Sequence, residues 1–188
     1  MPNKDPRQEI ISKIRYFLTP TSKEPLDDKG HYRIAGVEQA DVETTEGGFR
    51  FLREKCSVEV PGRMMLAVTN EKRASGQIFV GYLEQNERGE WRFSGGASTS
   101  LGGVSAHPRV NLGGGGWPDH FHAGGYVVDN GLDIARVRLV AANGTIVEDN
   151  VQNNIVLFFT DQRVEIPLQA ELFDRAGELV SSHNVFGR

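Results

Sequence analysis

Cysteine is nearly missing from this sequence, because Cys56 is the only one among 188 residues. A single thiol forms no internal disulfide bond, which excludes a small disulfide-stabilised scaffold. A chain of this length buries roughly 70% of the surface that it exposes when unfolded, so a hydrophobic core alone can hold it together. We therefore expect an ordinary globular protein of one or two domains.

Long apolar runs are missing as well. Purely apolar segments reach only five residues, as in Ile155–Phe159, whereas a membrane-spanning helix needs about 18. Residues 1–11 contain neither the apolar segment nor the small-residue cleavage site of a secretory signal. We expect a cytoplasmic protein without a membrane span, and the lone reduced cysteine agrees with that compartment.

Positive charge is in deficit, with 21 Lys and Arg against 25 Asp and Glu and a formal net charge of -4. A protein that binds nucleic acid or an anionic membrane surface normally carries a concentrated basic face. The composition therefore predicts no nucleic-acid partner.

Familiar catalytic motifs are absent too, although the chain has 22 glycines. The run Gly113–Gly116 is not followed by Gly-Lys-Ser/Thr, so it does not indicate a phosphate-binding loop. No Gly-x-Ser-x-Gly sequence indicates a hydrolase nucleophile. Glycine and serine dominate the surroundings of this run, and we interpret residues 101–122 as a Gly-rich loop.

One segment, residues 5–18, has helical periodicity. Its apolar residues recur on one face, while charged residues occupy the other. Asp5 is a suitable N-cap with Pro6 in the first helical position, and Pro20 ends the pattern. The sequence predicts one amphipathic N-terminal helix, followed by a polar linker that extends to about residue 50.

Strand patterns fill most of the remaining chain. Residues 64–69, 78–83 and 91–94 alternate or are apolar, with a turn at 85–89, and predict an antiparallel meander within 51–100. Asn143-Gly144 predicts a hairpin with a type I′ turn, since both residues tolerate positive φ. A clear alternation at 163–172 contains Pro167, which cannot donate to a ladder, so we expect an edge strand or a bulge there.

Short strands without intervening helices are typical of an antiparallel β-sandwich. The fold class that we predict is therefore mainly β, an antiparallel β-sandwich with one N-terminal helix. Four segments follow: 1–50 as helix and linker, 51–100 as the meander, 101–122 as the Gly-rich loop, and 123–188 as the main sandwich part. Whether 51–100 and 123–188 form one continuous domain stays open at this point.

The C-terminal segment also supports a resemblance. The sequence from Gly125 to Asp149 contains an Ala-Arg-Val-Arg-Leu strand before an Asn-Gly turn, and Phe173–Val180 supplies a closing Asp-Arg-Ala-Gly turn. In these features the chain resembles the C-terminal halves of many bacterial proteins, and immunoglobulin-like and fibronectin-like modules more generally. The resemblance implies an immunoglobulin-like sandwich over the last 65 residues or so, and it carries no site residues. The Cys…Trp…Cys pattern of true immunoglobulin domains is absent.

The histidines form the best candidate metal site. In an extended segment His120 and His122 project to the same side, and His107 with Asp119 could add a third imidazole and a carboxylate. This donor set suits Zn²⁺ or another divalent ion. The alternative interpretation is that these are ordinary polar side chains on a loop or edge strand.

Aromatic side chains near the same loop form a candidate binding surface. We expect Trp117, Asp119, Phe121 and Tyr126 to contribute to it, although aromatic residues at strand spacing are often core residues. The first functional hypothesis is thus a non-catalytic binding or interaction module that needs no cofactor. The alternative is a metal-dependent enzyme that uses His120 and His122. An exposed edge at Pro167, or the N-terminal helix, offers a route to self-association.

Overall fold

The computed structural model describes residues 5–18, 23–25, 32–34, 49–70, 77–100, 105–115 and 120–187, with backbone only for 14–18, 23–25, 32–34 and Asn70. The described part is mainly β, its sheets are antiparallel and it contains one short helix, as the sequence predicted. The elements are α1 (Pro6–Leu18), β1 (Lys23–Pro25), β2 (Tyr32–Ile34), β3 (Phe49–Cys56), β4 (Arg63–Asn70), β5 (Gln77–Gln85), β6 (Trp91–Ser100), β7 (Arg109–Gly115), β8 (Phe121–Val128), β9 (Ile134–Ala141), β10 (Ile146–Asn150), β11 (Ile155–Thr160), β12 (Leu168–Asp174) and β13 (Leu179–Phe186).

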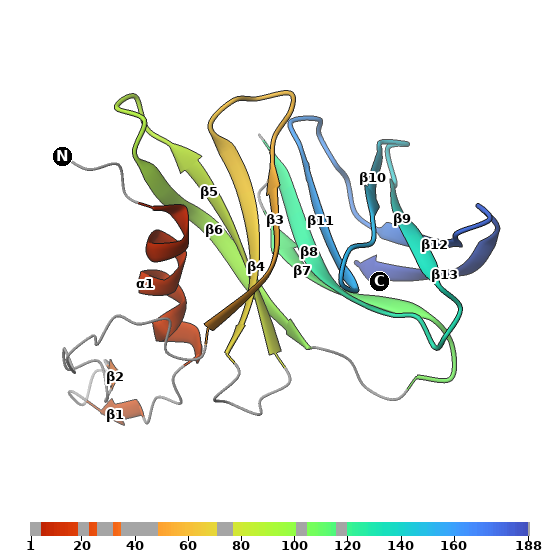
Figure 1. The fold of residues 1–188 in the computed structure, drawn as a ribbon, viewed down its shortest axis with the longest axis horizontal. Helices are drawn as coiled ribbons and strands as arrows, with labels where there is room; N and C mark the ends of the chain where they lie inside the picture. Colours follow the sequence, from red (N-terminus) through yellow and green to blue (C-terminus); the bar gives the residue numbers. More distant parts are fainter. Residues whose placement is uncertain are drawn as a thin grey trace.

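These elements stack in four layers (Figure 1). Helix α1 lies on a sheet with the strand order β3-β4-β5-β6, here called the helix-side sheet. Next comes the middle sheet, β11-β8-β7, and then the outer sheet, β10-β9-β12-β13. Strands β1 and β2 pair separately with each other. The middle and outer sheets form the expected sandwich, and the helix-side sheet covers the other face of the middle sheet.

Helix α1 begins as its sequence predicts. The Asp5 side chain accepts a hydrogen bond from the Arg7 backbone amide at 2.9 Å, and Pro6 occupies the first helical position. Ile10 is fully buried against the helix-side sheet, where it lies over Gly81 of β5. A Cβ at position 81 would collide with the Ile10 side chain, so glycine permits this close approach.

The helix-side sheet is the predicted meander, and its two central strands are buried on both faces. Along β4, Met64 and Leu66 face the helix while Met65 and Ala67 face the middle sheet. The strand β5 divides its side chains in the same way. This position between two layers explains why β4 is an uninterrupted apolar run rather than a strict alternation.

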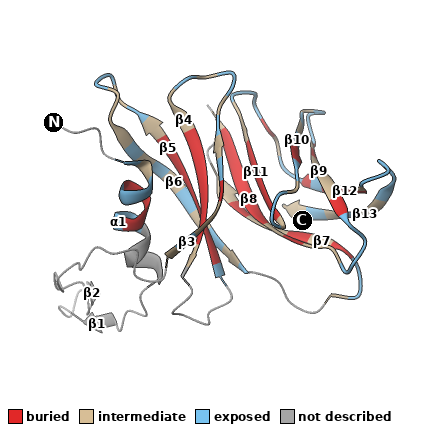
Figure 2. Ribbon diagram, viewed as in Figure 1, coloured by how far each residue is buried: buried red, intermediate tan, exposed pale blue. Residues whose placement is uncertain are grey.

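The middle sheet is also buried on both faces (Figure 2). Ile155 and Leu157 of β11 pack against the helix-side sheet, whereas Val156 and Phe158 pack against the outer sheet. The middle sheet therefore shares one hydrophobic interior with each neighbour. Contacts of β10 with β11 and of β13 with β7 join the middle and outer sheets along both margins. At the second margin, Ser181 Oγ donates a hydrogen bond to the Pro108 carbonyl at 2.8 Å.

The Gly-rich segment differs from its prediction. Residues 109–115, including Gly113–Gly115, form strand β7, and 121–122 begin strand β8, so the loop predicted over 101–122 is wrong for these positions. Glycine is needed here for close packing. A Cβ on Gly114 would meet the His122 carbonyl and Ala123 of β8, and one on Gly125 would meet the Asn111 carbonyl of β7. Because glycine has no side chain, these strands show no alternation in the sequence.

The strand after Pro167 is not at an edge, so that alternative of the prediction is wrong, while the other alternative, a bulge, agrees with a register shift between Leu168 and Gln169. Strand β12 begins at Leu168, one residue after the proline, and pairs with β9 on one side and β13 on the other. Pro167 follows a cis peptide bond and stands outside the ladder. Position 167 therefore offers no free strand edge for self-association.

The Asn143-Gly144 hairpin is present, but its turn type differs from the prediction. Only Gly144 has a positive φ, of 82°. The Gly144 amide donates to the Ala141 carbonyl at 2.9 Å, and the Ala141 amide donates to the Thr145 carbonyl at the same distance. This is the three-residue connection in which a turn is followed by a left-handed glycine.

A buried ionic cluster connects all three large sheets. Asp149 of β10 forms ion pairs with Arg53 at 2.7 Å and Lys55 at 2.8 Å, both from β3, and accepts a hydrogen bond from the Leu157 amide of β11. Arg53 also donates to the carbonyls of Asn150 and Ile155. Every charge in the cluster thus has an opposite charge or a backbone partner. Among the described residues, no helix is long and apolar enough to cross a membrane.

Candidate functional site

The two adjacent histidines of the sequence prediction do lie together. His122 is on β8 and His120 directly precedes this strand, and their rings stack with centroids 5.5 Å apart. Tyr82 of β5 stacks on both, at 5.0 Å from His120 and 4.8 Å from His122. The three rings fill the space between the helix-side and middle sheets, next to Gly95 of β6, where a Cβ would come within 3.0 Å of the His122 ring.

Burial controls the protonation of this ring stack. His122 is only 6% exposed, and its Nδ1 has no hydrogen-bond partner among the described residues. Burial, with a further contribution from the nearby charge of His120, lowers the pKa of His122 to about 4. Burial also raises the pKa of Tyr82, and the hydrogen bond from its hydroxyl to Glu84 at 2.6 Å adds to this effect. Both groups are therefore neutral at physiological pH.

Glu84 connects the ring stack to the surface. It accepts hydrogen bonds from Tyr82 and from Ser94 Oγ, and it forms an ion pair with Arg63 at 3.2 Å. Burial on its own would raise the pKa of Glu84, but the two hydrogen bonds and the charge of Arg63 outweigh burial and lower it. Arg63 also pairs with Asp161, so both carboxylates of this cluster share one arginine.

The other predicted metal ligands are not added to the histidine pair. His107 is exposed on the segment before β7, where its carbonyl accepts a hydrogen bond from Ser105. Asp119 lies outside the described residues. Within the described part of the chain, no group of three or more His, Cys, Asp or Glu side chains is arranged to hold a metal ion. The metal site therefore stays a prediction that rests on two imidazoles.

The residues of the predicted aromatic surface do not lie together in the described part of the structure. Trp117, like Asp119, lies outside the described residues. Phe121 is 1% exposed and packs edge-on against Phe186 inside the sandwich, so its ring presents no surface to a ligand. Tyr126 packs between the helix-side and middle sheets, and its hydroxyl accepts a hydrogen bond from Asn154 Nδ2 at 3.3 Å. Asn154, the hydrogen-bond partner of Tyr126, lines a surface cavity that Tyr126 itself does not line.

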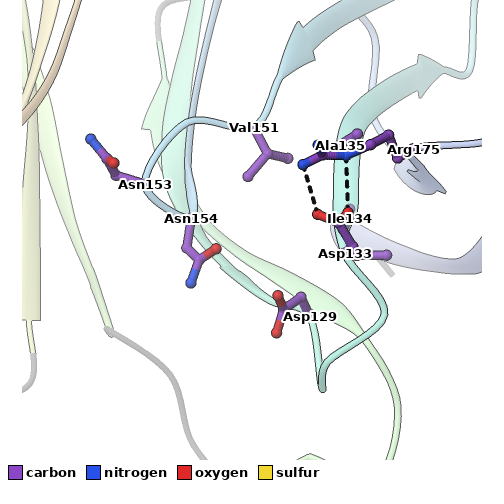
Figure 3. A pocket seen from close by; sticks show the side chains of 8 residues that line it. All are labelled: Asp129, Asp133, Ile134, Ala135, Val151, Asn153, Asn154 and Arg175. Carbon is purple, nitrogen blue, oxygen red and sulfur yellow. Dashed lines mark hydrogen bonds and ion pairs between the residues drawn. The ribbon is translucent and has the colours of Figure 1, made fainter.

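That cavity is a depression of about 420 Å³ at one end of the sandwich (Figure 3). It lies where the β8–β9 turn, the β10–β11 turn and the β12–β13 turn meet. Three of its polar lining residues are charged, namely Asp129, Asp133 and Arg175. The full lining is Asp129, Asp133, Ile134, Ala135, Val151, Asn153, Asn154 and Arg175.

The turns around this depression have an uncommon backbone. Asn130, Asp133, Asn153 and Asn154 have φ between 50° and 60°, and they are the non-glycine residues with positive φ in the described part of the chain. Asn and Asp tolerate this conformation better than other residues, but it still costs about 1 kcal/mol or more at each position. Such backbone positions cluster at binding sites more often than elsewhere, which draws attention to this end of the molecule.

Hydrogen bonds hold the β8–β9 turn and the β10–β11 turn in place. Asn154 is fixed from both sides, because its carbonyl accepts from the Val127 amide at 2.8 Å and its side chain donates to Tyr126. The Asn153 side chain points away from the depression and donates to the Leu52 carbonyl of β3. Asn130 donates to the Ser105 carbonyl at 2.9 Å. Hydrogen bonds from these turns therefore connect the depression to the helix-side and middle sheets.

Sequence reasoning missed this depression. Its only local signals are the turn-forming runs Asp129-Asn130-Gly131 and Asn153-Asn154, which predict turns but not that the turns meet. Comparison with known proteins found no matching family model, no similar curated protein and no similar solved structure. The immunoglobulin-like or fibronectin-like character of the sandwich therefore stays a prediction.

Proposed function

We propose that the protein is a non-catalytic binding module that holds a small polar ligand in the depression between the β8–β9, β10–β11 and β12–β13 turns. The observation that carries this proposal is the depression itself. Its volume of about 420 Å³ falls within the range of small-molecule sites, about 300–1,000 Å³. Loops at the end of a rigid sandwich are also a common place for recognition.

The chemistry of the lining favours binding over catalysis. Among the described residues, no His, Cys, Ser or Lys side chain lines the depression, so its carboxylates are the available nucleophiles. Asp133 is held by Arg175 through contacts of 2.9 Å and 3.2 Å. This pairing leaves Asp129 as a lone carboxylate rather than half of an acid–base pair.

A fragment screen with a blocked variant tests the proposal. Ligand-observed NMR against a library of small polar molecules should find several that bind the wild-type protein. Val151→Phe places a ring in the depression, so these molecules should no longer bind to this variant. Val58→Phe is the matched control, since Val58 is 98% exposed in the β3–β4 loop. Fragments that bind Val151→Phe as well as wild type, or a screen that finds none, would reject the proposal.

Deletion of residues 112–117 is unsuitable as a test of the binding surface. Positions 112–115 belong to β7, which pairs with β8 along its whole length. Their removal would take out part of the middle sheet, and loss of binding would then only report loss of the fold.

The metal-dependent enzyme remains the alternative, and one observation favours it. His120 and His122 stack at 5.5 Å, and the buried Nδ1 of His122 has no partner among the described residues. Metal analysis of protein purified without a histidine tag decides this alternative. Stoichiometric divalent metal that is lost in His122→Ala would support it, whereas metal-free protein with a melting temperature insensitive to Zn²⁺ and EDTA would remove it.

The compartment belongs to the same proposal. Cys56 is a free thiol on an exposed residue, and such a thiol is best preserved in a reducing environment. This supports a cytoplasmic location, which localisation of a fluorescent fusion in cells would test.

A further inference from the structure

We propose that the depression binds an ammonium or guanidinium group on a short alkyl stem, with Asp129 as its charge partner and Asn154 as a second acceptor. This inference rests on the proposed function and names its ligand class. It follows from an unequal supply of hydrogen-bond donors and acceptors around the depression.

Asp129 has spare accepting capacity. One of its carboxylate oxygens accepts the Gly131 amide at 3.1 Å, which fixes the turn. The other oxygen has no partner among the described residues, and Figure 3 shows the carboxylate facing the open space. Asp129 is partly buried. A carboxylate in this position gains most from a ligand that brings both hydrogen atoms and a positive charge.

Asn154 adds a second acceptor on the same side. One N–H of its amide group is already used, because it donates to the Tyr126 hydroxyl. The side-chain oxygen therefore remains for a ligand, and in Figure 3 the Asn154 side chain lies above Asp129 across the space. Two neighbouring acceptors match the several N–H bonds of an ammonium or guanidinium group.

The remaining charges of the lining cancel. Arg175 reaches Asp133 with two nitrogens, at 2.9 Å and 3.2 Å, in a forked arrangement. Asp129 is thus left as one uncompensated negative charge among the lining residues. An anionic ligand would meet this charge and the lone pairs of Asn154, so the lining discriminates against it.

Part of the remaining wall is apolar. Val151, Ile134 and Ala135 line the depression between the two polar sides. An alkyl stem of three or four carbons can lie against these side chains while its charged end reaches Asp129, as Lys and Arg stems do on protein surfaces. The group can belong to a free amine or to a Lys or Arg side chain of a peptide, because both present a positively charged group on an alkyl stem to the depression.

The test is an NMR titration with four probes: n-butylammonium, n-butylguanidinium, neutral n-butanol and a lysine blocked at both its amino and carboxyl groups. The two butyl cations should shift the amide signals of 129–133 and 151–154, with a Kd in the millimolar range that is normal for so few atoms. The Kd of n-butanol should be at least about tenfold higher, since it lacks the charge-assisted bond.

Two variants show whether Asp129 is responsible. Asp129→Asn keeps an oxygen for the Gly131 amide and so preserves the turn, but it should raise the Kd of both cations about tenfold, which corresponds to one charge-assisted hydrogen bond. Glu87→Gln is the matched control, because it removes the same charge from the exposed β5–β6 turn. It should leave each Kd unchanged.

The outcomes separate this inference from the function on which it rests. Equal binding of n-butanol and the cations, or unchanged cation binding in Asp129→Asn, overturns the ligand class and leaves a binding depression in place. No shift at these amides with any probe overturns the ligand class as well, and the fragment screen then decides the function independently. Where the cations bind, tighter binding of the blocked lysine indicates a peptide side chain, and weaker binding indicates a free amine.

Discussion

At the residue scale, His122 combines burial with an unsatisfied ring nitrogen. Its Nδ1 has no hydrogen-bond partner among the described residues, and its ring stacks on Tyr82 of β5. A buried polar atom without a partner is costly, and a positive charge at the same place would cost more. The site therefore holds a neutral imidazole and resists protonation.

This resistance predicts a pH-dependent stability. Burial lowers the pKa of His122 from 6.5 to about 4, so between these values the unfolded chain takes up a proton that the folded chain does not. Stability should therefore fall as the pH drops from about 6.5 to about 4, and this one group should contribute roughly 2 kcal/mol between pH 7.5 and 4.5. Urea unfolding at the two pH values measures the loss.

Two matched variants isolate the contribution of His122. His122→Gln cannot titrate, so its stability should change less than that of wild type over the same interval. His107→Gln removes an exposed histidine and should lose as much stability on acidification as wild type does. Equal losses for wild type and both variants would show that other groups cause the pH dependence.

Asp149 is the second residue whose environment predicts a measurable effect. It partners Arg53, Lys55 and the Leu157 amide, and its side chain is 6% exposed. Asp149→Ala removes the carboxylate that balances the buried charge of Arg53 and the partly buried charge of Lys55, and it takes the acceptor from the Leu157 amide, which should cost about 3–5 kcal/mol. Glu148→Ala removes the neighbouring carboxylate, which pairs with Arg136 and Arg138 on the outward face, and should cost about 1 kcal/mol or less. Similar costs in urea unfolding would contradict the connecting role of Asp149.

At the scale of elements, glycine allows β7 and β8 to pair. Gly125 lies opposite Leu112 in the register, with its α-carbon close to the Asn111 carbonyl of the neighbouring strand. Glycine in a strand normally weakens it, but here a side chain would hold the two backbones apart. Within the tetraglycine run, a Cβ on Gly114 would likewise meet the backbone of β8, whereas Gly115 has open space around it.

A pair of alanine substitutions tests this role. Gly125→Ala brings its methyl group into the Asn111 carbonyl, and the strands must shift to accept it, so the melting temperature should fall by several degrees or more. Gly115→Ala meets no atom within 4 Å and should leave the melting temperature nearly unchanged. A tolerated Gly125→Ala would show that this strand pair adapts easily.

The elements that the sequence predicted correctly are those defined by neighbours in the chain. Helix α1, the strands β4 to β6 of the meander and the β9–β10 hairpin all follow from local periodicity and turn residues, whereas β3 was not predicted as a strand. Strand β7 was missed because glycine carries no alternation. The internal position of β12 was missed because its two partners are set by packing that the sequence of β12 does not contain.

The same distinction applies to the candidate sites. The two-residue period of a strand correctly brought His120 and His122 to one side. Tyr82 was not predicted beside them, since it comes from another sheet about 40 residues away along the chain. The end depression combines two turns that join the middle and outer sheets with one hairpin turn of the outer sheet, and no local pattern shows that they meet.

At the scale of the whole molecule, the middle sheet joins two interiors. Ile155 belongs to the interior shared with the helix-side sheet, and the next residue, Val156, belongs to the interior shared with the outer sheet. A strand cannot lose one of these contacts and keep the other in its native form. The helix-side and outer sheets should therefore unfold together.

Native-state hydrogen exchange tests this coupling. The slowest amides of β4 and β5 should exchange with the same opening free energy as those of β9 and β12, and that value should equal the unfolding free energy from urea. Ile155→Ala should lower both sets by the same amount. A helix-side sheet that opens at a clearly lower free energy would instead indicate two folding units.

The middle sheet also limits how this protein can be altered. Strands β8 and β11 have no row of side chains that faces water. New charges, labels or affinity groups therefore have to be attached to other strands. The outer sheet provides suitable positions, because Arg138, Glu148 and Glu171 form a ladder of ion pairs across its outward face. Substitutions on this outward face would leave the hydrophobic core between the middle and outer sheets unchanged.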